Sequence, residues 1–414
     1  KNISGWSEDL FGGLTVEPTV FTGYETLNDT GVVVALSDEE TLTDAIATDE
    51  EAKDGVLVVL DKTPFYAEMG GQVADNGLLT GPECSLRVLD VKKTPKGYYV
   101  HTCVLESGIV KVGDHLNAQV DKEYRMSVCR NHTATHLLQA ALREVLGDHV
   151  HQAGSYQDAE ITHFDFTHFS AVTPEELARV QKIVNDKIYE SMNVTVKEMP
   201  IEEAKKLGAM ALFGEKYGDV VRVVSVEDGF SKELCGGTHM DNTARLGLFK
   251  ILSESSVASG VRRIEGVTAM GVLDLLSVQM ATLRDSARAM KVINPTELPL
   301  HAQQMMAQLK EKDKEIESLN AKLAQNRLDG VFQNAQEVDG VKVVFALLSG
   351  TGSDALRALC DKAKERPEAI AAVFAGVSGG KATLAAACSK AAQQKGLKAG
   401  VLVKEVAQLC GGNG

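Results

Sequence analysis

The sequence predicts an α+β protein of several domains: a small β-barrel, a mixed α/β core with a metal site, a helical linker and a second α/β globular domain. Three observations lead to this prediction. The chain has 414 residues, which is too long for one hydrophobic core. Short β-branched runs dominate its first part, a helical pattern follows the middle, and strands and helices alternate toward the end. Finally, His and Cys recur in two short motifs with metal-ligand spacing.

The first part of the chain predicts the β-barrel, over residues 21–120. Three apolar or β-branched runs, at 31–36, 55–60 and 97–104, are typical of strands, and Gly, Asn and Asp turns separate them. Many short strands in one segment favour a small barrel. Residues 1–20 are expected to be the end of a preceding domain.

Residues 121–268 mix helices and strands, and they contain the first His motif. His132 and His136 open an apolar-periodic stretch that ends at Gly147, which predicts a helix. On a helix, residues four apart project from one face. Both imidazoles are therefore expected to point the same way.

The second motif places Cys235 and His239 on either side of a Gly-Gly pair, after the β-branched run 220–226. Glycine lets the backbone turn tightly enough to bring a thiolate and an imidazole together. With the two His of the helix, this makes a tetrahedral set of three nitrogens and one sulfur, which suits Zn²⁺. A zinc peptidase would need Glu where Thr133 stands, and the H-x-E and P-C-x-x-C motifs of base deaminases are absent.

Residues 269–337 predict a helical segment that is interrupted at Asn294-Pro295, because proline ends a helix. In its second part, apolar residues recur at seven-residue steps, which indicates two or three imperfect heptads. These positions are Leu309, Ile316 and Leu323, with Met305 and Leu319 at the companion positions. Either a coiled coil or a lone antiparallel hairpin packed on itself would explain the pattern.

Residues 338–414 predict an α/β unit. Its expected strands are 341–348, 370–374 and 400–403, and its expected helices are about 353–364 and 382–394. The loop 376–381 differs by one residue from a nucleotide-binding P-loop and lacks the hydroxyl that would hold magnesium. Such a Gly-rich turn before a helix is still able to bind a phosphate through backbone N–H groups.

The two His/Cys motifs resemble those of the editing domain of alanyl-tRNA synthetases and of the free-standing AlaX-type editing proteins. Further segments match in the family's order: 63–72, 152–155, 164–166, 208–217 and 261–265. His163 departs from the pattern, since Arg is usual there, which puts a phosphate contact at this position in doubt. The resemblance covers nearly the whole chain.

The resemblance implies the editing and C-terminal parts of an alanyl-tRNA synthetase, hydrolysing seryl- and glycyl-tRNA(Ala), while the parent enzyme attaches alanine to tRNA(Ala) with ATP. A pocket for alanine cannot exclude glycine or strongly reject serine, so a second, hydrolytic site is needed. Two alternatives are a non-catalytic, zinc-stabilised tRNA-binding module and a free-standing trans-editing deacylase. Whether the zinc is catalytic or structural is left open by the sequence.

The resemblance also gives roles to residues around the metal. Thr135 and Gln152 match family positions that shape amino-acid selection and catalysis. Thr63 is expected to hydrogen-bond a serine hydroxyl, and Glu68 and Gln72 to line or brace the pocket. Each of these would otherwise be a structural polar residue with its hydrogen bonds satisfied.

Contacts to tRNA are expected from Arg262, Arg263 and Lys381. By resemblance, residues 338–414 form a truncated tRNA-binding domain, and the helical segment is able to mediate a homodimer. Residues 341–414 contain ten Lys and Arg against five Asp and Glu, so this end is basic within a chain of net charge −14. Such a charge split favours contact with phosphate, although a solvated surface would show it too.

Composition indicates a cytoplasmic protein without a membrane partner. Apolar residues make up 44% of the chain, and no apolar run approaches the ~18 residues of a membrane helix. Seven scattered Cys argue against a disulfide framework and for a reducing compartment. The chain starts at Lys1 rather than Met, so its ends are expected to be cut.

Overall fold

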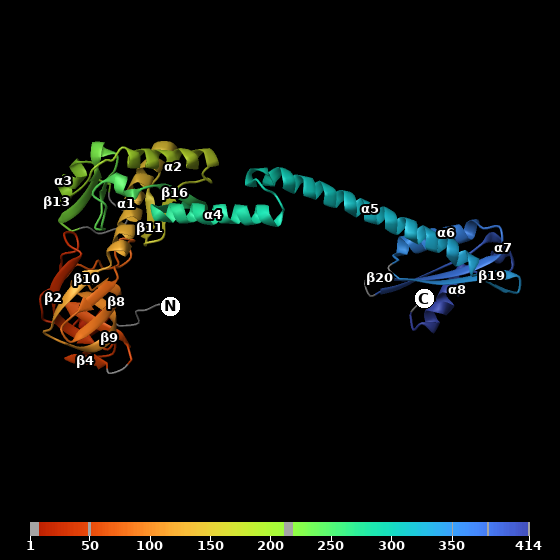
Figure 1. Ribbon diagram of the computed structural model, residues 1–414, viewed down its shortest axis with the longest axis horizontal. Helices are drawn as coiled ribbons and strands as arrows, with labels where there is room; N and C mark the ends of the chain where they lie inside the picture. Colours follow the sequence, from red (N-terminus) through yellow and green to blue (C-terminus); the bar gives the residue numbers. More distant parts are fainter. Residues whose placement is uncertain (1–7, 49–50, 211–217, 350, 379–380, 413–414) are drawn as a thin grey trace. The chain divides into compact units, whose positions relative to one another are not determined.

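The computed structural model describes most of the 414-residue chain. The described residues are 8–48, 51–210, 218–349, 351–378 and 381–412, without the side chains of 8–9, 320–321, 323–329, 378 and 381. The chain divides into two compact units, Lys1–Ala281 and Thr282–Gly414. Figure 1 labels the helices and strands of each unit.

The first unit begins with a closed, antiparallel barrel of six strands, as predicted (Figure 1). Strand β10 pairs with β7 on one side and with β2 on the other, and this double pairing closes the ring. Val, Leu and Ile side chains that alternate along the strands fill the interior, as in Val56, Val58 and Leu60. In ring order the strands are β2 (Asn28–Ser37), β5 (Lys53–Leu60), β9 (Tyr99–Lys111), β8 (Cys84–Lys93), β7 (Gly77–Thr80) and β10 (His115–Val120).

The segment before the barrel packs on the barrel's outer surface. Phe11, in the 3₁₀ turn η1 (Glu8–Phe11), is buried against a cluster that includes Leu57 and Tyr98. The Tyr98 hydroxyl donates to the Val16 carbonyl at 2.8 Å. The segment from Phe11 to Val16 therefore packs on the barrel. Four short strands lie at its edges: β1 (Val20–Phe21), β3 (Leu42–Thr43), β4 (Ala45–Thr48) and β6 (Lys62–Thr63).

The core that follows is built around the predicted helix, α1 (Lys122–Leu146). Asp121 caps its N-terminus by accepting from the Tyr124 amide, and Gly147 caps its C-terminus. Helix α1 packs with α2 on an antiparallel sheet of order β11-β12-β17-β16, and a second sheet, β13-β14-β15, lies before Cys235. The elements are β11 (Gln152–Gln157), β12 (Thr162–Thr167), α2 (Pro174–Tyr189), β13 (Val194–Pro200), α3 (Ile201–Lys206), β14 (Val220–Val226), η2 (Glu227–Gly229), β15 (Lys232–Leu234), η3 (Thr243–Leu246), β16 (Phe249–Ala258) and β17 (Val261–Thr268).

Arg125, in the first turn of α1, ties the barrel to the core. Its Nε lies 2.8 Å from Oδ1 of Asp75, and its Nη atoms donate to the carbonyls of Gly23 and Pro64. Asp75 in turn accepts from the Tyr66 amide at 2.7 Å. Both members of the ion pair are almost fully buried. The pair fixes the loop that carries Gln72 against the first turn of α1.

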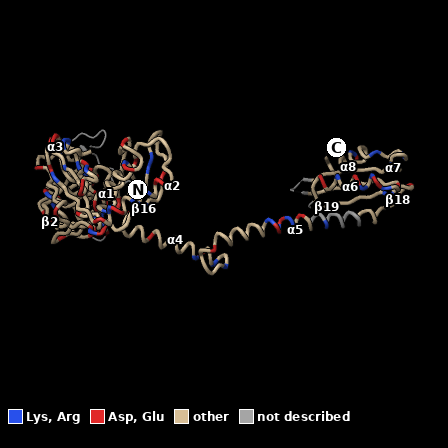
Figure 2. Tube along the Cα trace, turned by 90° about the horizontal axis from the view of Figure 1, so that it is seen from above, with Lys and Arg blue, Asp and Glu red and all other residues tan. Residues whose placement is uncertain are grey.

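The helical segment consists of α4 (Met270–Ala289), the turn η4 (Pro295–Glu297) and α5 (Leu298–Gln333), so the predicted interruption at Asn294-Pro295 is present. The heptad positions Met305, Leu309, Ile316 and Leu319 are exposed on α5, and the side chain of Leu323 lies outside the described residues. Basic and acidic residues alternate along the middle of this helix (Figure 2). No helix in the described part of the chain is long and apolar enough to cross a membrane.

The second unit contains a four-stranded sheet with one parallel pair, β19 and β20. Helix α6 buries Leu356 and Leu359 against one face, next to Phe374. The predicted helix at 353–364 is thus confirmed as α6. The elements are β18 (Gln336–Val338), β19 (Val341–Ser349), α6 (Ser353–Glu365), β20 (Ile370–Ser378), β21 (Lys381–Cys388), α7 (Lys390–Gln394) and α8 (Ala399–Leu409).

Two predictions for this unit were wrong. The Ala-rich stretch expected to be a helix at 382–394 is strand β21 up to Cys388, paired along its length with β20, and only 390–394 are helical. Tertiary pairing here overrides the high helix propensity of alanine. The apolar run 400–403, expected to be a strand, lies in helix α8. A run of four apolar residues does not distinguish a strand from a helix.

Candidate metal centre

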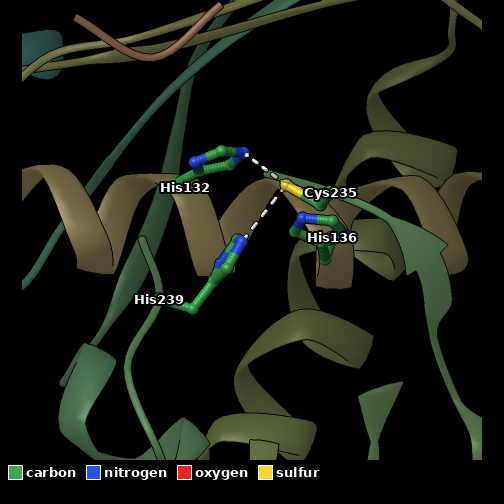
Figure 3. Close-up of side chains that lie close together, drawn as sticks. All are labelled: His132, His136, Cys235 and His239. Atoms are coloured by element: carbon green, nitrogen blue, oxygen red, sulfur yellow. Dashed lines mark hydrogen bonds between the residues drawn. The ribbon is translucent and has the colours of Figure 1, made fainter. Parts of the chain in front are cut away.

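The structure brings together the four residues predicted to bind a metal (Figure 3). His132 and His136 project from the same face of α1, whereas Cys235 and His239 come from the segment after β15. One ligand atom from each residue lies within 4.8 Å of the others. Sγ of Cys235 is 3.4 Å from Nε2 of His132 and 3.3 Å from Nε2 of His239.

Each imidazole is oriented by a contact to its other nitrogen. Nδ1 of His132 is 2.8 Å from Oε1 of Gln72, Nδ1 of His239 is 3.2 Å from Oγ1 of Thr133, and Nδ1 of His136 is 2.8 Å from Oε2 of Glu233. Ligand His residues in metal sites are held in the same way, which keeps the proton on the outer nitrogen. All three Nε2 atoms are left to face the thiol.

The electrostatics favour a thiolate beside these rings. Burial alone would raise the pKa of the Cys235 thiol, but the imidazoles of His132 and His239 lower it well below its usual value. Burial lowers the pKa of His239 to about 3. Burial also acts to lower the pKa of His136, yet the Glu233 carboxylate outweighs it and raises that pKa to about 10. The cluster therefore favours a thiolate at Cys235, the form that binds a metal, and metal binding would displace the proton that the raised pKa of His136 keeps on its ring.

Of the two glycines, only Gly237 serves the site through its lack of a side chain. A Cβ atom at Gly237 would lie only 2.1 Å from Cε1 of His132, so no other residue fits there. At Gly236, by contrast, a Cβ atom would meet nothing within 4 Å. Close approach to His132 therefore explains the glycine at 237, where the sequence had suggested only a tight turn.

The arrangement passes a simple test for a metal site. Nε2 of His136 is buried and has no hydrogen-bond partner within the described residues. Such a buried nitrogen costs free energy unless something binds it. The S···N distances are near the ~3.5 Å implied by bonds of about 2.3 Å to sulfur and about 2.05 Å to nitrogen in a tetrahedral shell. The cluster is therefore able to bind a metal ion.

The residues expected to be catalytic lie in different environments. Gln72 is buried and bonds to His132, and its amide also pairs with Thr238. The Thr135 hydroxyl donates to the Asn131 carbonyl and bonds to Thr162. Gln72 and Thr135 are thus next to the ligands, but their polar groups already have protein partners.

The other three predicted residues differ in burial and in their hydrogen-bond partners. Thr63 is fully buried, and its hydroxyl is 2.8 Å from Nε2 of the buried His101 in the barrel. Gln152 is half-buried and donates to the Ser155 hydroxyl at 3.1 Å. Glu68 is exposed. The hydroxyl of Thr63 therefore braces the barrel in this structure.

The arginines predicted to contact tRNA are both in ion pairs. Arg262 bonds to Glu254, with Nη2 and Oε2 2.7 Å apart, and Arg263 makes two hydrogen bonds to Asp165. A phosphate would have to compete with these carboxylates. Lys381 begins strand β21, but its side chain lies outside the described residues, as do residues 211–217 of the matching segment 208–217.

Sequence reasoning missed several residues beside the ligands. Glu233 could have been found, because strand alternation places it on the same side as Cys235 two residues later. Thr133 could not, since only the fold brings it to His239. Gln139 and Gln157 are both at least 95% buried, and each has a carbonyl oxygen without a hydrogen-bond partner among the described residues. Gln157 donates to the Thr135 hydroxyl at 3.5 Å, and Gln139 follows Thr135 by one turn of α1.

Two family models match the chain. Residues 11–124, which include the barrel, match tRNA synthetases class II (A). Residues 221–265, which include Cys235 and His239, match the threonyl and alanyl tRNA synthetase second additional domain. The barrel and the segment that contains Cys235 and His239 therefore match two different family models.

The relatives extend this match over the remaining residues. The alanine–tRNA ligase of Bacillus subtilis is 45% identical over 404 residues, or 97% of this chain and 45% of the relative. Those of Halalkalibacterium halodurans and Acetivibrio thermocellus are 42% and 44% identical, over 98% and 100% of the chain and 46% of each relative. The chain belongs to the alanyl-tRNA synthetase family. It spans about half the length of these alanyl-tRNA synthetases, and the family resemblance expected from its motifs is confirmed.

Proposed function

We propose that this chain is the proofreading part of an alanine–tRNA ligase and hydrolyses the ester of seryl- and glycyl-tRNA(Ala), with Zn²⁺ at the cluster. One observation carries the proposal: three imidazole Nε2 atoms and one thiol converge, and each ring is oriented by a protein contact at Nδ1. The parent enzyme would attach alanine to tRNA(Ala) with ATP. The match to about half the length of an alanine–tRNA ligase supports this assignment.

The discrimination problem explains why such an enzyme needs a hydrolytic site. A pocket that accepts alanine cannot exclude the smaller glycine, and an added hydroxyl on serine is rejected only weakly. Differences of this size give about 10- to 200-fold discrimination. Hydrolysis at a second site removes the glycyl and seryl esters that the first site fails to exclude.

The zinc would be held by His132, His136, Cys235 and His239. When bound, zinc polarises an ester carbonyl or lowers the pKa of a water molecule to about 7. The chain's own residues prepare this environment. Gln72, Thr133 and Glu233 hold the three rings in place, with His132 and His136 buried and Cys235 and His239 half-buried.

Gln139 and Gln157 are the acceptors that we assign to the substrate's amino acid. An unpaired buried acceptor costs about 1–3 kcal/mol, so a bound donor stabilises it. The ammonium group of any aminoacyl ester and the hydroxyl of serine are such donors. A site that hydrogen-bonds a hydroxyl strongly prefers the substrate that has it. This would favour seryl over alanyl ester, in the role expected of Thr63, whose hydroxyl is engaged inside the barrel.

The second unit and the helices are proposed to support tRNA binding and assembly. Residues 341–414 have a net charge of +5, which favours phosphate. Helix α5 has an exposed apolar row, as a homodimer through this helix would require. The row consists of Met305, Leu309, Ile316 and Leu319.

A second candidate is a non-catalytic tRNA-binding module with structural zinc. The observation in its favour is the number of donors, because four protein ligands complete a tetrahedral shell, as they do in structural sites. A free-standing trans-editing deacylase would share the catalytic site and differ only in its context.

The test is deacylation of seryl-, glycyl- and alanyl-tRNA(Ala), together with metal analysis of the purified chain. We expect rapid hydrolysis of the first two esters, slow hydrolysis of the third and one zinc per chain. The Cys235→Ala variant should lose the zinc and the activity. Cys410→Ala is the matched control, because Cys410 is exposed in the second unit.

Zinc-loaded, folded protein that binds tRNA but hydrolyses none of the esters would contradict the catalytic assignment and favour the binding module. Equal rates for seryl and alanyl esters would instead contradict the proofreading role.

A further inference from the structure

The segment that carries Cys235 is held by Arg222 of strand β14. Nη1 of Arg222 donates to the carbonyl of Cys235 at 3.1 Å and also to the carbonyl of Gly237. In the backbone, the Cys235 amide donates to the carbonyl of Arg222 at 3.0 Å. One side chain thus holds the carbonyl groups of the residues on both sides of Gly236.

Tyr24, from the barrel, completes this arrangement. Its hydroxyl donates to the carbonyl of Gly236, 212 positions away in the sequence. The Arg222 guanidinium lies over the Tyr24 ring, with its central carbon 3.9 Å from the ring centroid. Phe21 supports the ring from the side, at 4.8 Å between centroids. Stacking and hydrogen bonding therefore position the two side chains together.

Gln72, also from the barrel, holds the next residue. Its Oε1 accepts from the Thr238 amide at 2.8 Å, and its Nε2 donates to the Thr238 hydroxyl at 2.8 Å. The backbone from Cys235 to Thr238 is therefore hydrogen-bonded at every residue to Arg222, Tyr24 or Gln72. Two of these three side chains belong to the barrel.

We propose that Tyr24 and Arg222 form a clamp that positions the Cys235–His239 segment for metal binding, and that the barrel thereby sets how tightly the metal centre holds its ion. This inference rests on the proposed metal site of the editing function and names positioning residues for it, not catalytic ones. The segment is rich in glycine, so without the clamp it would have to be ordered at the moment of metal binding. A prefolded segment avoids that entropy loss and slows release of the ion.

Two substitutions should weaken the clamp to different extents. Tyr24→Phe keeps the ring under the guanidinium but removes the hydroxyl that bonds Gly236. Arg222→Lys keeps the positive charge but loses the planar guanidinium, whose Nη1 donates to two carbonyls and whose plane lies over the Tyr24 ring. Loss of one neutral hydrogen bond corresponds to an affinity about fivefold weaker. Loss of a contact that orients a metal ligand weakens metal affinity about 10- to 100-fold.

The experiment measures Zn²⁺ release to a competing chelator from the full chain, and the visible absorption spectrum of the Co²⁺-substituted protein. We expect release to be about fivefold faster in Tyr24→Phe and at least about tenfold faster in Arg222→Lys. The Co²⁺ bands should change in Arg222→Lys, because the ligand geometry loosens. Control variants are Tyr189→Phe, an exposed tyrosine of α2, and Arg245→Lys, an exposed arginine paired with Asp241.

Wild-type rates of release in both clamp variants, with unchanged Co²⁺ spectra, would overturn the inference. If Arg222→Lys fails to fold, Tyr24→Phe still decides, since its side chain is 44% exposed and its ring is retained. Faster release in the variants supports the clamp even if the wild type hydrolyses no ester, because that failure would concern the proposed function alone. A wild-type chain that binds no Zn²⁺ would overturn the clamp together with the metal site.

Discussion

The barrel–core junction and the His/Cys cluster are both buried and polar, yet their atoms are paired differently. At the junction, each guanidinium nitrogen of Arg125 has an acceptor in Asp75, Gly23 or Pro64. At the cluster, each outer nitrogen contacts a side-chain oxygen, but Nε2 of His136 has no hydrogen-bond partner among the described residues, and its Nδ1 has only the ion-pair contact to Glu233. The first network is complete within the protein, whereas the second is complete only with a ligand.

This difference separates two uses of buried polar groups. A closed network specifies how two parts of the fold fit together, because every alternative packing would leave a charge unpaired. An open network places its unsatisfied atoms where an ion or substrate supplies the missing bond.

The largest expected effect is at the junction. Arg125→Met would leave Asp75 buried without its cation, which costs about 3–5 kcal/mol of unfolding free energy. Urea unfolding of the variant measures this loss. Arg87→Met is the control, because Arg87 pairs with Glu106 at the surface and such pairs contribute about 0–1 kcal/mol. Similar values for the two variants would show that the junction is not the closed structural network described here.

A second closed network lies in the barrel, where His101 bonds to Thr63 and to the Val58 carbonyl. Burial lowers the pKa of His101 from 6.5 to about 4. The unfolded chain therefore binds a proton more readily, and this group's stabilisation, present above pH 6.5, is lost as the pH falls toward 4.

Unfolding free energies at pH 7.5 and pH 5 should differ by about 2 kcal/mol more in the wild type than in His101→Gln, which keeps both hydrogen bonds but does not titrate. The same pH dependence in both proteins would place the acid sensitivity elsewhere.

The smallest expected effect concerns the open network. Gln72→Met removes the acceptor of the His132 Nδ1 proton and should weaken Zn²⁺ binding about tenfold, or about 1.4 kcal/mol. Competition with a chelator gives the affinity. Gln152→Met serves as the comparison, because Gln152 bonds to Ser155 and not to a ligand. If Gln152→Met weakened binding as much as Gln72→Met, the orienting role of Gln72 would be refuted.

Patterns that act over one or two turns could be predicted from the sequence. The barrel strands follow from alternating β-branched runs, and the joint position of His132 and His136 follows from helical spacing. The failures in the second unit occurred where tertiary pairing decided between strand and helix, as in the Ala-rich β21.

Most partners of the ligands could not be predicted, because no local pattern connects them. Gln72 is 60 positions from His132, and Tyr24 is 212 positions from Gly236. The resemblance indicated Gln72 as a residue that lines or braces the pocket, but which ring it orients follows only from the fold. Nothing in the sequence around Tyr24 or Arg222 indicated the clamp.

The bond between Gln72 and Thr238 has a consequence for the newly made protein. Its two partners are 166 positions apart, so a ribosome adding about 5–20 residues per second needs roughly ten to thirty seconds to pass from one to the other. Domains generally fold as units from the N-terminus during synthesis. The barrel would therefore be formed before the Cys-Gly-Gly-Thr-His segment emerges, and this segment would dock on a surface that is already in place. If the cluster binds Zn²⁺ as proposed, loading of the ion would then be one of the last steps in the maturation of this unit.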